Sequence, residues 1–268
     1  MDIVAVTAQW LADPAHWQGP NGIPLRLGEH VALSVVSLIL AAVVAMPLGL
    51  WIGHTGRFSW LVVSSANAWR ALPSFAVIGL LVPFTTLLDP NLGFILYPTL
   101  AAMIVLAGPP ILVNSYEGVA GVDRDLVEAA RGMGMSERQI LFGLEMPVAL
   151  PVLAAGIRSA AVQVIATATL GATFGFGGLG RYIVLGDANR DNGELFGGVV
   201  LVATLALTTL AVFVLIERRA EPTFGPEDAP TRCAGHRAED VQHSTPAAYS
   251  RPTSRRPAPR DRAARKGR

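Results

Sequence analysis

Long uncharged apolar runs alternate with short polar stretches along this chain. Five runs of 18 to 27 residues contain no Asp, Glu, Lys or Arg: Val31–Gly53, Ala71–Leu88, Pro90–Tyr116, Ser159–Gly180 and Leu195–Ile216. A helix needs roughly 20 predominantly apolar residues to cross the hydrocarbon core of a bilayer. The pattern therefore predicts an all-α, polytopic membrane protein with about five transmembrane helices, near residues 31–53, 71–88, 92–113, 148–172 and 195–216.

Composition supports this division and adds two flanking segments. The chain is 51% hydrophobic and only 15% charged, whereas a soluble domain carries about a quarter charged residues. We expect an N-terminal extracytoplasmic segment at 1–27, a transmembrane domain at 28–219 and a tail at 220–268. The tail is rich in Pro, Ala, Ser and Arg and has few large apolar residues, so we predict that it is disordered.

Arginine positions indicate which way the spans face, because short loops rich in Lys and Arg stay in the cytoplasm. With five spans, one side of the membrane receives seven arginines and the other side three. The seven are Arg57, Arg70, Arg124, Arg131, Arg138, Arg218 and Arg219, and the three are Arg26, Arg181 and Arg190. The count predicts an N-terminus outside and a C-terminus in the cytoplasm. A sixth crossing at Phe58–Trp69 would remove this difference in arginine count between the two sides. We therefore interpret that stretch as a lead into a helix kinked at Pro73.

The polar stretch between the third and fourth runs begins with a helix-start signal. Asp125 followed by Glu128 fits a capping box, with Asp123 as the alternative N-cap. The helix is expected to run to about Met133, because Gly134 can adopt the left-handed conformation that terminates helices.

A second capping box, Ser136 followed by Gln139, predicts another short helix directly afterwards. We expect this second helix to end before Pro147. The pair has an adaptable apolar face that suits docking into a partner's groove, formed by Met133, Met135, Ile140, Leu141 and Leu144. Acidic residues outnumber arginines between residues 123 and 145, which argues against nucleic-acid binding.

Several kinds of chemistry are excluded or disfavoured. The one lysine, Lys266, is followed only by Gly267 and Arg268, so the chain has no phosphate-binding P-loop. No carboxylate falls within the five runs, which disfavours an ion-coupled carrier. The single cysteine and five scattered histidines have no metal-ligand spacing. We therefore expect no catalytic residue and no metal site.

Two other features have alternative interpretations. Arg158 lies near the start of the fourth span, where its side chain could extend to the cytoplasmic interface or line a pore. Residues 175–180, "GFGGLG", fit a dinucleotide-binding pattern, but that fingerprint requires a preceding strand. We interpret these glycines as an outer gate or hinge, at Gly175, Gly177, Gly178 and Gly180.

The stretch from residue 128 to residue 147 resembles a family signature. The pattern E-A-A-x3-G-x9-I-x-L-P is typical of permease subunits of binding-protein-dependent ABC importers. Here it reads Glu128, Ala129, Ala130, Gly134, Leu144, Met146 and Pro147, with two conservative changes. The resemblance runs from about Leu27 to Arg219 and includes "RALPSFAVIGLLVPF" and "PPILVNSYEGV". Within the family the chain is most similar to permeases for osmoprotectants such as glycine betaine, choline or carnitine.

The resemblance implies a type I importer permease fold in the bacterial cytoplasmic membrane. Residues 124–146 would be the coupling helices, which dock into a separate ATPase subunit present in two copies. ATP and Mg would bind to that ATPase, and this chain would hold no cofactor. The other implied partners are a second permease, identical or paralogous, and an extracytoplasmic binding protein facing residues 175–194. Alternatives are a permease for another small solute such as an amino acid, an ion-coupled secondary carrier, or a non-transporting scaffold or sensor.

Aromatic residues near the second and third runs are candidates for the translocation path. A quaternary ammonium solute favours aromatic faces through cation–π attraction. The candidates are Trp69, Phe75, Phe84 and Tyr97, together with Pro73. The alternative role of these aromatic side chains is packing in the core or against lipid.

Overall fold

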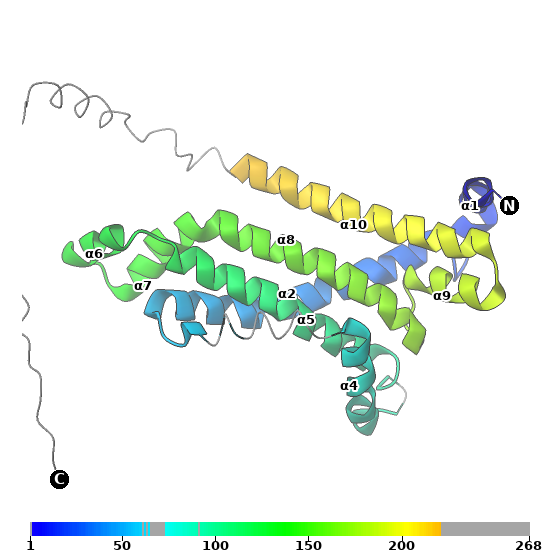
Figure 1. The fold of residues 1–268 in the computed structure, drawn as a ribbon, viewed down its shortest axis with the longest axis horizontal. Coiled ribbons are helices and arrows are strands. Elements are labelled where there is room, and N and C mark those ends of the chain that lie inside the picture. The colour runs from blue at the N-terminus through cyan, green and yellow to red at the C-terminus, as the bar shows by residue number, and fades with distance from the viewer. Residues whose placement is uncertain (1, 61, 63, 65–72, 91, 221–268) are drawn as a thin grey trace, which may run out of the picture. The chain divides into compact units, whose positions relative to one another are not determined.

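The computed structural model of the chain describes residues 2–60, 62, 64, 73–90 and 92–220. Every regular element in that part of the chain is a helix, which confirms the all-α prediction (Figure 1). In chain order the elements are α1 (Ile3–Ala12), η1 (Pro14–Trp17), α2 (Ile23–Thr55), α4 (Ser74–Leu88), α5 (Leu96–Ala120), α6 (Arg124–Gly132), α7 (Glu137–Ile140), η2 (Leu141–Glu145), α8 (Met146–Gly171), η3 (Ala172–Phe174), α9 (Gly180–Asn189) and α10 (Asn192–Ala220). The predicted tail lies outside the described residues, apart from the last residue of α10.

Four helical stretches of the described chain are long and apolar enough to cross a membrane. They contain α2, α5, α8 and α10, and they correspond to the predicted spans at 31–53, 92–113, 148–172 and 195–216. The helices extend beyond the apolar runs. For example, α2 begins at Ile23 and ends at Thr55, where Gly56 takes the left-handed conformation.

The remaining predicted span, 71–88, corresponds to the shorter helix α4. Its 15 residues reach about 22 Å, less than the roughly 30 Å of a bilayer core. The predicted kink at Pro73 is wrong, because Pro73 is the N-cap of α4 and has an extended backbone. Proline disfavours helical geometry in the residue before it, which makes it a natural starting point for a helix. Most of the predicted lead at 58–69 lies outside the described residues.

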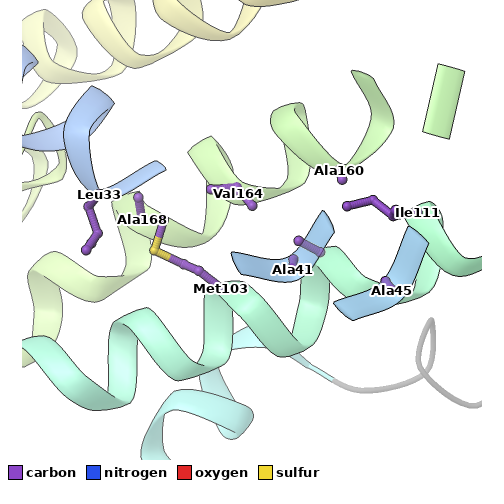
Figure 2. Packing of buried hydrophobic residues seen from close by; sticks show 9 residues of the cluster. Leu33, Ala41, Ala45, Met103, Ile111, Ala160, Val164 and Ala168 are labelled. Carbon is purple, nitrogen blue, oxygen red and sulfur yellow. The ribbon is translucent and has the colours of Figure 1, made fainter. Parts of the chain in front are cut away.

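The core is formed where α2, α5 and α8 pack along one another (Figure 2). Nine buried side chains form it: Leu33, Ala41, Ala45, Met103, Ala107, Ile111, Ala160, Val164 and Ala168. Five of the nine are alanines. Helices in lipid associate through close van der Waals packing, which small side chains permit.

Glycines bring the same helices still closer together. A Cβ atom added to Gly49 of α2 would lie 2.5 Å from the Ser115 Cβ atom and 2.6 Å from the Leu112 carbonyl oxygen of α5. A Cβ atom on Gly156 of α8 would lie 2.6 Å from the Asn114 Cβ atom. These positions require glycine because atoms of the neighbouring helix occupy the space of a side chain.

Prolines interrupt the hydrogen bonding of several apolar helices. Pro47 lies inside α2, Pro83 inside α4, Pro109 and Pro110 inside α5, and Pro151 inside α8. Proline has no backbone N–H, so each leaves the carbonyl four residues earlier without its helical donor. Neighbouring helices and side chains make such interruptions tolerable in membrane helices.

A second buried cluster lies where α1 and α9 pack against α10, at the opposite end of the bundle from α6 (Figure 1). It contains Trp10, Ile23, Leu179 and Tyr182. The Trp10 ring stacks on His16 at a centroid distance of 4.4 Å and meets Tyr182 edge-on at 5.3 Å. The apolar runs predicted neither α1 nor α9, and α9 lies within the stretch expected to be an outer loop.

Candidate functional site

The predicted helix pair forms at one end of the bundle, beyond α5 and α8 (Figure 1). Its first helix, α6, begins after Asp123, whose side chain accepts a hydrogen bond from the Asp125 backbone N–H at 2.9 Å. The preferred start at Asp125 is therefore wrong, and the alternative N-cap is the one used. Asp125 lies instead in the first turn, where its negative charge complements the helix dipole.

The bend between the two helices has the predicted geometry. Gly134 has a φ of +83°, a conformation that costs glycine little and other residues considerably more. Its backbone N–H donates to the Arg131 carbonyl oxygen at 3.0 Å. The second capping box is also confirmed, with the Ser136 backbone N–H donating to the Gln139 side chain at 2.8 Å.

The second helix does not end before Pro147, contrary to our expectation. α7 continues through the π-helical segment η2 into α8 without a break. Pro147 is the second residue of α8. Proline interrupts the backbone hydrogen bonding of a helix, and a π turn is one of the places where a helix accommodates such an interruption. The second helix of the pair and the membrane span α8 are therefore one continuous helix.

The side chains of the predicted apolar face do not all point the same way, because some are exposed and others pack toward the spans. Met133 is 77% exposed, whereas Ile140 is fully buried. Leu141 packs against the cluster of Leu50, Val119, Ala149 and Leu153 on the spans. These side chains do not share one face, because the bend at Gly134 and the π segment each rotate the following residues out of the regular α-helical repeat. Leu126, Met133 and Phe142 are the large apolar side chains that remain exposed here.

The predicted signature residues have different environments. Glu128, Ala129 and Gly134 are exposed, Ala130 is buried, and Leu144, Met146 and Pro147 are half-buried. Glu128 lines a polar cavity of about 70 Å³ together with Arg124, Arg131, His54 and Glu145. Arg131 donates to Glu137 at 2.8 and 3.0 Å, and these hydrogen bonds raise the pKa of its guanidinium above the ordinary value. The exposed side of the pair is thus polar and charged, with a few large apolar side chains.

The aromatic candidates for the translocation path do not form one cluster among the described residues. Phe75 of α4 meets Phe174 of η3 at a ring-centroid distance of 5.2 Å. Phe84 is 62% exposed further along α4, and Tyr97 is half-buried at the start of α5. Pro73 caps α4, and Trp69 lies outside the described residues.

Three of the four predicted gate glycines, Gly175, Gly177 and Gly178, lie in a turn that is bound to α2 near its start, and Gly180 is the first residue of α9. Gly175 and Gly178 have positive φ angles of +92° and +72°. The Gly178 backbone N–H donates to a carboxylate oxygen of Glu29 at 2.9 Å, and the Leu179 N–H donates to Nδ1 of His30 at 3.3 Å. A Cβ atom on Gly177 would overlap the Glu29 carboxylate, and one on Gly180 would meet the Thr169 carbonyl oxygen at 2.5 Å. The sequence patterns did not identify Glu29 and His30 as partners of this turn.

Replacing Glu29 with alanine is expected to loosen this turn. The Gly178 N–H would lose a charged acceptor, and such a hydrogen bond contributes about 1.5–3 kcal/mol. Hydrogen exchange of the peptide containing the Gly178 amide should therefore become at least about tenfold faster. Tyr182→Phe is the control, because it removes only the hydrogen bond from Tyr182 to the Asn21 carbonyl oxygen. Unchanged exchange in Glu29→Ala would contradict the assignment.

Arg158 is not isolated in the fourth span. Its guanidinium forms an ion pair with Glu217 near the end of α10, at 3.2 Å. A charge near a membrane span is costly without a partner, and this contact supplies one between α8 and α10. Neither side chain was predicted to contact the other.

Comparison with known proteins identifies the chain. A family described as the binding-protein-dependent transport system inner membrane component matches residues 45–223, from the end of α2 through α10. The chain belongs to this family of transport permeases. The resemblance based on the residue 128–147 signature is therefore confirmed, and the protein is a permease subunit of an ABC importer.

The permease is similar over most of its length to permeases of known systems. It is 32% identical over 197 residues to the glycine betaine/carnitine/choline transport system permease protein OpuCB of Bacillus subtilis, covering 74% of this chain and 88% of that protein. It is 34% identical over 202 residues to the carnitine transport permease protein OpuCB of Listeria monocytogenes, covering 75% and 89%. It is 32% identical over 182 residues to the osmoprotectant import permease protein OsmW of Salmonella typhimurium, covering 67% and 82%.

The fold of the permease also matches solved structures. A chain in an inward-facing structure of the MetNI methionine ABC transporter has a TM-score of 0.65 at 22% identity, and the match covers 78% of the permease and 99% of that chain. A second crystal form gives a TM-score of 0.64, covering 72% and 94%. The type I importer permease fold expected from the resemblance is therefore confirmed.

Proposed function

We propose that this permease carries a small osmoprotectant, such as glycine betaine, choline or carnitine, across the bacterial cytoplasmic membrane. The observation that carries the proposal is its similarity to permeases named for these solutes, at 32 to 34% identity over 82 to 89% of their length. The N-terminus would lie outside and the C-terminus in the cytoplasm, as the arginine count predicts.

ATP hydrolysis would take place in a separate ATPase subunit, present in two copies and holding ATP and Mg. The helix pair α6–α7 would dock on that subunit as the coupling helices. Three features support this role: the pair lies at one end of the spans, its outer side is exposed and charged, and it continues into α8 without a break. A push on the pair would therefore move α8 directly.

Two further partners complete the proposed importer. A second permease, identical or paralogous, would form the translocation path together with this chain. An extracytoplasmic binding protein would deliver the solute to the α9 end of the bundle. The exposed aromatic rings of Phe75 and Phe84 suit a quaternary ammonium solute, whose cation is attracted to aromatic faces.

The test is purification of the tagged permease with its partners, followed by reconstitution into liposomes. We expect an ATPase subunit and a binding protein to copurify. Uptake of labelled glycine betaine, choline, carnitine and methionine is then compared with ATP or a non-hydrolysable analogue supplied to the ATPase. The proposal expects uptake of at least one of the first three solutes that depends on hydrolysis.

Two other outcomes would contradict the proposal in different ways. ATP-driven uptake of methionine alone would keep the importer and change the solute. Uptake driven by a membrane potential or sodium gradient without any ATPase would make the protein an ion-coupled carrier. Removal of residues 221–268 distinguishes the permease from a scaffold or sensor that works through its tail. A permease should keep transporting without these residues, whereas the scaffold or sensor should lose its function.

A further inference from the structure

A chain of four ionisable side chains joins the helix pair to the end of α2. The His54 ring, in the last turn of α2, lies between two carboxylates. Its Nδ1 atom is 2.6 Å from a Glu145 oxygen of η2, and its Nε2 atom is 3.1 Å from a Glu137 oxygen of α7. Glu137 is in turn held by Arg131 of α6. The order Arg131, Glu137, His54, Glu145 therefore alternates in sign across four elements when His54 is protonated.

The contact between His54 and Glu145 is largely buried. The Glu145 side chain is 5% exposed and that of His54 is 12% exposed. A buried carboxylate is costly unless it has a charged or hydrogen-bonded partner. A neutral imidazole has one N–H, so it can donate to only one of two carboxylates, whereas an imidazolium donates to both. In this structure one ring nitrogen of His54 faces each of the two carboxylates.

The π-helical segment explains how both carboxylates reach one ring. Glu137 and Glu145 are eight residues apart, and eight residues of regular α-helix rotate about 80° beyond two full turns. A π turn holds one residue more than an α turn, so one α turn and one π turn together take about eight residues. The segment Leu141–Glu145 is π-helical, and it returns Glu145 to the side of the helix that carries Glu137.

We propose that His54 is a positioning residue that fixes the α6–α7 pair to α2, so that movement of the pair is passed to α2 as well as to α8. This inference rests on the proposed coupling role of the pair. α8 is joined to the pair by continuous helix, whereas α2 meets it only through side chains that are distant in sequence. Leu141 and Met146 pack against the apolar cluster that contains Leu50, but such contacts are non-directional. The two His54 contacts with Glu137 and Glu145 fix the position of the pair along α2.

The test compares variants of the complete importer in proteoliposomes, measuring solute uptake and ATP hydrolysis together. His54→Gln keeps a hydrogen-bonding side chain that cannot be charged, and His54→Lys provides a positive charge with several donors. Thr55→Ala is the matched control, because Thr55 is the exposed neighbour of His54. Its hydroxyl donates to the Trp51 carbonyl oxygen at 2.8 Å and accepts from the Arg57 backbone N–H at 3.4 Å, and neither partner belongs to the helix pair.

We expect His54→Gln to hydrolyse on the order of tenfold more ATP per solute transported, because the buried Glu145 loses its ion pair. His54→Lys should restore that ratio to within about threefold of the unaltered protein, and Thr55→Ala should not change it. Hydrogen exchange of residues 129–135, measured on the same samples, should be faster in His54→Gln and normal in His54→Lys.

Three outcomes would overturn the inference. An unchanged ATP-to-solute ratio with folded His54→Gln would show that His54 does not position the pair. An equal loss of uptake, ATPase activity and folded protein in both His54 variants would show a role in stability alone. Failure of the unaltered complex to show ATP-driven uptake would remove the proposed function and this inference with it, and it is distinguished from the other two because no variant is needed to observe it.

Discussion

Gly134→Pro abolishes uptake in the reconstituted importer while the protein still inserts in the membrane: this is the largest functional effect that we expect. Gly134 has a φ of +83°, whereas proline is restricted to about −65°. Proline also removes the N–H that donates to the Arg131 carbonyl oxygen. The bend between α6 and α7 cannot form, so the pair cannot present its outer side to the ATPase. Uptake per membrane-inserted protein measures the effect.

Two alanine variants distinguish the effect of the left-handed backbone at Gly134 from the general effect of replacing a glycine in this stretch. A Cβ atom on Gly134 meets no atom within 4 Å, so Gly134→Ala adds only the strain of a left-handed conformation, about 1–2 kcal/mol, and should leave partial uptake. Gly132→Ala, also in open space and without a positive φ, should transport normally. Undiminished uptake with Gly134→Pro would refute the coupling role of this bend.

The largest effect on stability is expected from Gly49→Leu. A side chain at this position would overlap the Ser115 Cβ atom and the Leu112 carbonyl oxygen of α5. A backbone atom cannot move aside as a flexible side chain can, so α2 and α5 must separate, which removes the contacts of the alanine-rich core. Recovery of monodisperse protein in mild detergent should fall at least about tenfold, because overpacking costs about 1–3 kcal/mol.

The same helix provides the control for this substitution. Gly28 also lies in α2, and a Cβ atom there meets nothing within 4 Å. Gly28→Leu should therefore be recovered at the level of the unaltered protein, because it adds an apolar side chain to an exposed position. If both variants are recovered equally well, the close approach of α2 and α5 is not required for folding.

The main spans were predictable because lipid imposes one simple requirement, a long apolar helix. α1 and α9 were not predictable in the same way, since they are short helices held by tertiary contacts. Trp10, for instance, is buried by Ile23, Leu179 and Tyr182, none of which lies near it in sequence. The start of α4 was misplaced because apolar character continues through Pro73 while the helix does not.

The candidate site was predictable where the signal was local. The Gly134 bend and the Ser136–Gln139 capping box follow from residues within a few positions of one another. The sequence favours Asp125 as the N-cap because Glu128 follows it three residues later, but the Asp123 side chain is the one that caps the helix. A local pattern does not decide between two acidic residues this close together. The contact between His54 and Glu145 spans 91 residues and depends on a π segment for which the sequence has no established signal.

The prolines inside the spans have a consequence for the energetics of movement. Pro47, Pro109, Pro110 and Pro151 lie in the three helices that form the core, and Pro47 and Pro151 are near the ends that meet α6 and α7. At each of these prolines one backbone hydrogen bond of the helix is already missing, so bending the helix there does not have to break that bond. The core helices should therefore bend most easily at these prolines, and two of the prolines, Pro47 and Pro151, are close to where the helix pair is attached.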